Sequence, residues 1–149
     1  TDGFRYVYQP LAGDVTITAL ITSQIWRNKL TQAGVMIRDS LSSNSKQASM
    51  TLTWSQGAKF RTRTETGGAS NAATESNIAK YPYWVRLVKA GDEVSGYVSP
   101  NGESWTQVGS TTTITSDNTA VNMYVGLAVT TYNDGKFNDA IFKEVTVSV

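Results

Sequence analysis

Apolar and polar residues alternate with a period of two along much of this chain, and this pattern restricts the fold more than any other feature. In one segment Val15, Ile17 and Ala19 alternate with Thr16 and Thr18. Successive side chains of a β-strand point to opposite faces, so such a segment is expected to form a strand with one buried face. No segment of useful length shows the 3.6-residue period of an amphipathic helix. Similar alternation predicts an all-β sandwich or barrel, and it occurs at 35–38, 50–54, 123–130 and 142–149.

Turn-forming residues separate these segments. The clearest example is 99–102, Ser-Pro-Asn-Gly, which favours a type I turn followed by a left-handed glycine. In that register Tyr97 lies opposite Trp105, whereas a two-residue Asn-Gly turn would pair Val98 with Trp105. We prefer the first register, because Pro100 has the required φ. Neither an internal repeat nor a linker is visible, so the 149 residues are expected to form a single domain, 1–149.

Composition excludes several functional classes. The chain has no Cys and no His, which removes disulfides, thiolate chemistry, soft-metal sites and histidine-based acid–base catalysis. The formal net charge is +1, so no strong field attracts nucleic acid or an acidic membrane surface. No apolar run approaches the roughly 18–20 residues of a membrane span. We therefore expect neither nucleic acid nor membrane as a partner.

Three stretches together resemble a known family: 4–11 (FRYVYQPL), 33–41 (AGVMIRDSL) and 83–109 (YWVRLVKAGDEVSGYVSPNGESWTQVG), with 124–133 (YVGLAVTTYN) continuing the pattern. The combination is similar to the concanavalin A-like jelly-roll modules related to the "regulation of enolase" domain family. The resemblance implies a two-sheet antiparallel jelly-roll sandwich. It also implies an extracellular module, because relatives are appended to secreted bacterial enzymes that degrade polysaccharides.

One departure from the family concerns the N-terminal side. Family members usually carry further residues before the segment that resembles FRYVYQPL, enough for one or two more strands. We therefore expect a domain that lacks those strands. A cleaved N-terminal segment or a neighbouring domain of the same protein is an expected partner, since an unpaired sheet edge favours association.

The carboxylates give no sign of catalysis. Glycoside hydrolysis normally requires two carboxylates that face each other across a cleft. Only Asp39 and Glu65 adjoin predicted strands, and neither has a partner at diagnostic spacing. We therefore expect a non-catalytic domain. A jelly-roll hydrolase or lyase stays open as the less favoured alternative.

The aromatic residues include candidates for sugar binding, since a flat ring matches the C–H faces of sugars. Trp54 is in phase with Met50 and Leu52, which favours a place in the core. Trp105 is expected to pack within its own hairpin. Trp26 lies in a polar segment, where an exposed ring suggests a binding role as readily as a structural one.

The arginines give the sharpest hypothesis. Arg38, Arg61, Arg63 and Arg86 occupy the outward phase of predicted strands, and Trp84 is in phase with Arg86. A guanidinium is a planar fork of donors suited to vicinal hydroxyls or to a uronate carboxylate. If these strands share a sheet, one face would carry an aromatic ring and several arginines. The alternative is that the arginines are ordinary solvated residues that discourage edge pairing.

Small residues are expected to leave a groove on this face. Gly126 and Ala128 lie in the outward phase of 123–130, and the groove would end near Tyr132 and Asn133. The predicted ligand-binding residues are thus Trp26, Arg38, Arg61, Arg63, Trp84, Arg86, Tyr132 and Asn133.

A cofactor is not expected, although the loop 133–135 (Asn-Asp-Gly) and Asp139 could supply oxygen ligands to a structural calcium ion. No recognised calcium-ligand spacing occurs there, and an ordinary Asx turn explains the same residues. The sequence favours a carbohydrate-binding module whose partner is a polysaccharide or oligosaccharide. The main alternative is a docking domain of a larger extracellular protein.

Overall fold

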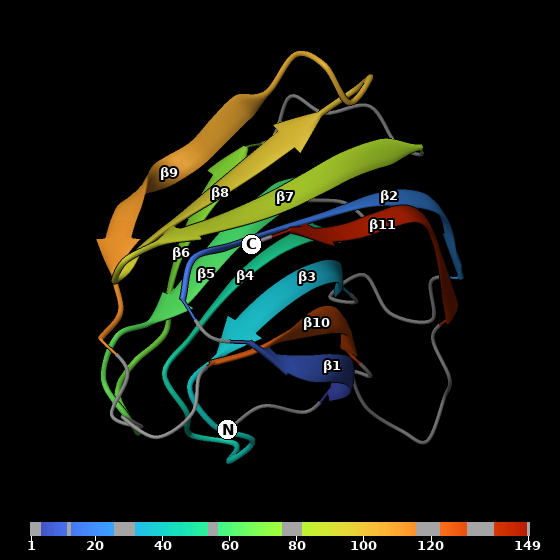
Figure 1. Ribbon diagram of the computed structural model, residues 1–149. Coiled ribbons are helices and arrows are strands. Elements are labelled where there is room, and N and C mark those ends of the chain that lie inside the picture. Colours follow the sequence, from blue (N-terminus) through green and yellow to red (C-terminus); the bar gives the residue numbers. More distant parts are fainter. Residues whose placement is uncertain are drawn as a thin grey trace.

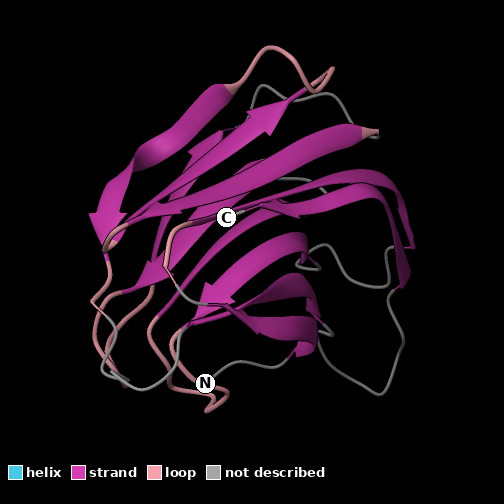
Figure 2. Ribbon diagram, in the orientation of Figure 1, coloured by secondary structure: helices cyan, strands magenta, loops and turns pink. Residues whose placement is uncertain are grey.

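The computed structural model describes residues 4–11, 13–25, 32–53, 57–75, 82–115, 123–130 and 139–148, and these residues form strands joined by turns and loops (Figure 1, Figure 2). Within this part of the chain there is no helix long and apolar enough to cross a membrane. The strands are β1 (Phe4–Leu11), β2 (Val15–Ile25), β3 (Gln32–Arg38), β4 (Gln47–Thr53), β5 (Ala58–Arg63), β6 (Asn71–Glu75), β7 (Tyr83–Ala90), β8 (Glu93–Ser99), β9 (Thr106–Thr113), β10 (Met123–Thr130) and β11 (Asp139–Ser148).

The strands form two antiparallel sheets. One sheet has six strands in the order β1-β10-β3-β4-β5-β6, and the other has five in the order β11-β2-β7-β8-β9. Figure 1 shows the two sheets as the layers of a sandwich, with the edge strands β1 and β11 on one side. The predicted all-β, two-sheet antiparallel sandwich is confirmed.

The core lies between the sheets and is built by the predicted alternation. Val15, Ile17 and Ala19 are buried, and so are the inward residues Met123 and Val125 of β10. Burying one apolar side chain of this kind contributes about 1.5–3 kcal/mol. The two inner faces together therefore supply the main driving force for folding, and the outer faces are left for polar side chains.

Phe60 of β5 is the large aromatic residue at one end of this core. A Cβ atom at Gly96 of β8 would lie 2.5 Å from Cδ1 of Phe60, so only a glycine leaves room for the ring. Gly109 of β9 has φ +73, and a Cβ atom added to it would lie 2.6 Å from Cβ of Ala73 on β6. The small residues let the sheets approach closely at this end.

The β8–β9 hairpin has the predicted left-handed glycine but not the predicted register. Gly102 has φ +78, as expected. However, Tyr97 pairs with Gln107 and Val98 pairs with Thr106, so both predicted partners of Trp105 are wrong. Side-chain caps hold a longer loop: Ser99 Oγ accepts hydrogen bonds from the backbone N–H groups of residues 101 and 102, and Asn101 Oδ1 accepts those of residues 103 and 104.

Strand β11 departs from simple alternation near its middle. The register against β2 shifts between Lys143 and Thr146, and Glu144 takes φ 50. Such a bulge adds a residue to one strand and changes the direction of its neighbours. Val145, next to the bulge, is 42% exposed.

Candidate functional site

The structure divides the predicted binding residues between two sheets. Arg38 lies on β3, and Arg61 and Arg63 lie on β5, all in the six-stranded sheet. Trp84 and Arg86 lie on β7 in the five-stranded sheet. The predicted arginines and Trp84 therefore do not share one face. Alternation in the sequence gives the side of its strand to which a residue points, but it does not give the sheet to which that strand belongs. Three further candidates lie outside the described residues, namely Trp26, Tyr132 and Asn133.

The rows of residues on the outer face of the six-stranded sheet follow from the strand register. One row runs Tyr8, Gly126, Met36, Ser49, Arg61 across five strands. Small residues do lie in the middle, as predicted, and the next row adds Ala128 and Gly34. The face therefore has an aromatic end on β1, a buried centre that contains Met36, Ser49 and Ala128, and a cationic end on β5.

Arg38 and Arg63 are on this face but are buried, at 1% and 5% exposure. Arg38 donates from Nε to the carbonyl of Ser40 at 3.2 Å and from Nη2 to that of Ser42. Nη1 of Arg63 donates to the carbonyls of Ser43 at 3.2 Å and Ser45 at 3.0 Å. The two guanidiniums hold the loop between β3 and β4 against the sheet. The expectation that they present open donor forks is corrected by these contacts.

Arg61 differs from these two arginines. Its side chain is half-buried, and its Nε donates to Oε1 of Gln32 at 3.2 Å. The same Gln32 oxygen accepts a hydrogen bond from Thr51 Oγ1 at 2.8 Å, which fixes the amide. Within the described part of the chain Nη1 and Nη2 of Arg61 make no hydrogen bond. The outer edge of an oriented guanidinium is thus available to a ligand.

Lys59 is a second cation beside Arg61. It lies two residues earlier on β5, in the same outward phase, and pairs with Thr51 on one side and Thr74 on the other. Burial lowers the pKa of Lys59, and the charge of Arg61 lowers it further. Lys59 and Arg61 are thus two neighbouring cations, and an anionic ligand bound here would relieve their mutual repulsion.

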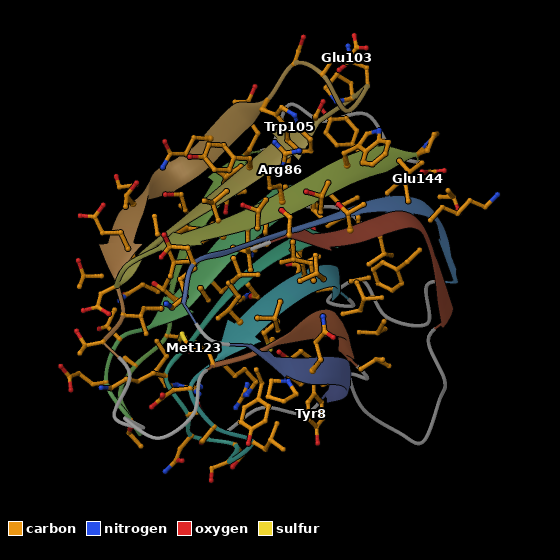
Figure 3. All side chains as sticks on the ribbon, in the orientation of Figure 1. Tyr8, Arg86, Glu103, Trp105, Met123 and Glu144 are labelled. Carbon is orange, nitrogen blue, oxygen red and sulfur yellow. The ribbon has the colours of Figure 1, made fainter. Side chains whose placement is uncertain are left out.

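Three tyrosines form the opposite end of the face, and none of them was among the predicted binding residues. Tyr6 and Tyr8 stack with ring centroids 5.2 Å apart, and Tyr8 meets Tyr124 edge-on at 5.4 Å. The Tyr6 hydroxyl lies 3.0 Å from the Met36 carbonyl and 2.8 Å from that of Tyr124, and burial raises the pKa of Tyr6. Tyr8 is 45% exposed and lies at the edge strand in Figure 3. The shared phase of Tyr6 and Tyr8 in FRYVYQPL was the available signal.

The predicted pair on the other sheet forms a separate cluster. The Arg86 guanidinium lies over the Trp105 ring, 3.9 Å from its centroid, and its Nε donates to Thr18 Oγ1 at 2.9 Å (Figure 3). Burial lowers the pKa of Arg86, and Tyr97 partly offsets this. The loop at Gly102 covers part of Trp84, since an added Cβ would lie 3.0 Å from its ring. These contacts attach the β8–β9 loop to β7.

Acidic residues form no metal centre in the described ranges, where no group of three or more His, Cys, Asp or Glu could hold an ion. The loop 133–135, considered for calcium, lies outside those ranges, and only the backbone of Asp139, at the start of β11, is described. The calcium prediction stays untested. The chemistry that the described surface offers is hydrogen bonding, charge and ring stacking.

Comparison with known proteins identifies the fold. No family model and no curated protein matches the sequence. Similar solved structures include a functionally unknown protein from Saccharomyces cerevisiae, with a TM-score of 0.68 at 17% identity over 96% of this chain and 72% of that one. A GH43 protein from Bacillus licheniformis gives a TM-score of 0.64 at 17% identity over 86% of this chain, and the aligned part spans 26% of that protein.

The carbohydrate binding module CBM66 from Bacillus subtilis gives a TM-score of 0.57 at 15% identity, over 100% of this chain and 84% of the module. At such identities the likeness concerns the fold alone. Together with the two antiparallel sheets, it shows that this chain is a jelly-roll sandwich of the kind found in carbohydrate-binding modules.

Proposed function

We propose that this chain is a non-catalytic carbohydrate-binding module of the concanavalin A-like jelly-roll type related to the "regulation of enolase" family. In this proposal it is extracellular and keeps a polysaccharide-degrading enzyme on its substrate. Its ligand surface is the outer face of the six-stranded sheet. The fold shared with a carbohydrate binding module and with part of a GH43 protein supports this class of function.

The observation that carries the proposal is the open edge of Arg61. Gln32 and Thr51 orient the guanidinium, and no described residue uses its terminal nitrogens. A planar, preoriented fork of donors suits two vicinal hydroxyls or a carboxylate. Lys59 beside it favours the carboxylate, so the ligand that fits best is a polysaccharide with uronate units.

The parts of this face that a ligand can reach are its two ends, at the exposed Tyr8 and the half-buried Arg61. Tyr8 and Arg61 are separated by four strand spacings, which is about 19 Å. The exposed Tyr8 ring offers a stacking platform at one end, and the cations offer charge-assisted hydrogen bonds at the other. A few such contacts give modest affinity per module, which tethering to an enzyme would amplify.

Affinity electrophoresis through gels that contain soluble polysaccharides tests this assignment. We expect retardation by uronate-rich polymers, reduced by salt because the contact is ionic. Arg61→Ala should weaken binding about ten- to hundredfold, the value of a lost charge-assisted hydrogen bond. Lys143→Ala removes an equal charge from an exposed site on β11 and should leave binding unchanged.

Two outcomes would reject this surface. If Arg61→Ala and Tyr8→Ala both bind like the unaltered chain, the ligand lies elsewhere. If no polysaccharide retards the protein, the carbohydrate-binding function itself is wrong. Release of product from any of these glycans would instead indicate an enzyme.

A docking domain of a larger extracellular protein is the second candidate, and one observation favours it. Val7 on the edge strand β1 pairs with Leu127, whose phase faces the core, yet Val7 is 75% exposed. An apolar side chain in that position suits a strand or loop of a neighbouring domain. A protein that is monomeric on a sizing column and that binds no separately expressed neighbouring domain would count against docking.

A further inference from the structure

A small open cavity lies at the edge of the sandwich, where the edge strands β6 and β9 meet. It is bounded by Phe60 and Thr62 of β5, Asn71, Ala72 and Ala73 of β6, and Ser110 and Thr112 of β9. Its volume is about 170 Å³. Drug-sized ligands occupy pockets of about 300–1,000 Å³, so this cavity suits one small ring and not a chain.

The cavity exists because the sandwich interior becomes polar at this corner. The inner phase of β5 passes from Ala58 and Phe60 to Thr62, and Thr62 pairs with Asn71 of β6. On the opposing sheet the inner residue Val108 is followed by Ser110 and Thr112. Apolar residues at these positions would extend the core and close the space.

A bulge in β9 forms one wall. The register between β8 and β9 shifts between the pairs Gly96–Val108 and Val94–Thr112, and Gly109 takes φ +73 there. A bulge redirects the side chains that follow it, here Ser110 and Thr112. Because a Cβ at Gly109 would lie 2.6 Å from Cβ of Ala73, this wall tolerates only glycine without rearrangement.

The lining is neutral and rich in hydrogen-bonding groups that the described part of the chain does not use. Among the described residues, the side chains of Thr62, Asn71 and Ser110 make no hydrogen bond, whereas Thr112 Oγ1 donates to the backbone carbonyl of Ser110 at 3.3 Å. Phe60 adds an aromatic group against which C–H groups can pack. Hydroxyls and an amide around an aromatic group suit a ligand with many hydroxyls and no charge.

We infer that this cavity, between β5, β6 and β9, binds a single neutral sugar ring, such as the terminal unit of an oligosaccharide or a free monosaccharide. The site is independent of Arg61, because Arg61 and Thr62 are adjacent on β5 and point to opposite faces of the sheet. One sugar ring in an open site gives weak binding, with a dissociation constant on the order of 1 mM.

Titration of ¹⁵N-labelled protein with neutral monosaccharides and their methyl glycosides, followed by NMR, tests the inference. We expect chemical-shift changes at the backbone amides of Ser110 and Thr112 and at the side-chain amide of Asn71. Ser110→Trp should fill the cavity entrance from an exposed position and weaken binding at least tenfold. Thr113→Trp adds the same bulk at an exposed neighbouring position on β9 and should retain binding.

Arg61→Ala separates this site from the outer face. Shift changes at Ser110 and Asn71 that persist in Arg61→Ala support the cavity, even if polysaccharide retardation is lost in the same variant. Shift changes confined to β1, β3 and the outward residues of β5 overturn the inference. So does the absence of shift changes with every neutral sugar, or equal binding by Ser110→Trp and Thr113→Trp.

Discussion

Gly126 occupies the middle of β10, where any side chain would collide with the neighbouring strand. A Cβ atom there would lie 1.9 Å from the carbonyl oxygen of Val7 and 2.7 Å from Cα of Tyr8. Real Cβ atoms essentially never approach within 3.0 Å, so β1 would have to move by at least 1.1 Å, the difference between 3.0 and 1.9 Å. We therefore expect Gly126→Ala to weaken the pairing of β1 with β10.

The size of this effect follows from the contacts that a shift of β1 would break. Two backbone hydrogen bonds and the bond of the Tyr6 hydroxyl are at risk, each worth about 0.5–1.5 kcal/mol. The free energy of unfolding should fall by about 2–4 kcal/mol. For a domain of this length that corresponds to a decrease in Tm of about 5–15 °C.

Gly34→Ala places the same clash where the backbone cannot move. A Cβ at Gly34 would lie 2.0 Å from the carbonyl oxygen of Met50 on β4, which is paired on both sides by β3 and β5. We expect a larger loss than for Gly126→Ala, or no folded protein. Gly13→Ala is the control, since Gly13 has φ +75 with no atom within 4 Å and should cost only the left-handed strain of about 1–2 kcal/mol.

Urea and thermal denaturation of the three variants, followed by circular dichroism, measure these differences. If Gly126→Ala and Gly34→Ala are no less stable than Gly13→Ala, the close backbone approach does not limit stability. If Gly34→Ala lowers the free energy of unfolding less than Gly126→Ala does, the assumption that the edge strand β1 moves more easily than β4 is wrong.

Two further predictions concern stability. In Trp105→Ala, loss of the contact with Arg86 should by itself lower the free energy of unfolding by about 0.5–2 kcal/mol. A double-mutant cycle with Arg86→Ala, measured by urea denaturation, should give this value as the Arg86–Trp105 coupling energy, and a coupling energy near zero would contradict the prediction. Burial raises the pKa of Tyr6 in the folded protein. The stability that the neutral Tyr6 hydroxyl contributes is therefore fully present below its unfolded-state pKa of about 10 and is lost as the pH rises above that value. Tyr6→Phe should therefore lower the free energy of unfolding by about 1 kcal/mol at neutral pH. It should also reduce the loss of stability at alkaline pH, measured by urea denaturation, and an unchanged loss would show that other groups cause it.

Much of the fold could be predicted from the alternation of side chains. Each buried face corresponds to a period of two in the sequence, so the pattern alone identifies Ile17 and Val125 as core residues, and both are buried. The left-handed conformation of Gly102 likewise follows from its turn. The pairing of Tyr97 could not be predicted, because the length of the hairpin loop depends on how the Ser99 and Asn101 side chains cap backbone amides.

The candidate site could be predicted only in part, and the arginines show why. Arg38, Arg61 and Arg63 have the same outward phase, but only Arg61 keeps an open edge among the described residues. The difference comes from backbone carbonyls of the loop between β3 and β4, and carbonyl groups carry no sequence signal. The sequence pattern also does not predict the sheet to which Arg86 belongs, since this depends on the long-range pairing of β7 with β2.

The two proposed surfaces differ in charge, and this difference determines which sugar unit each would select. Arg61 and Lys59 lie on the outer face, where an ionised ligand gains Coulomb energy that salt screens. The cavity near Ser110 has no charged lining residue among those described, and an acidic unit placed there would lose hydration without gaining a counter-charge. Acidic units along a chain would therefore favour the face, and a neutral terminal unit would favour the cavity, so salt should weaken the first interaction and leave the second nearly unchanged.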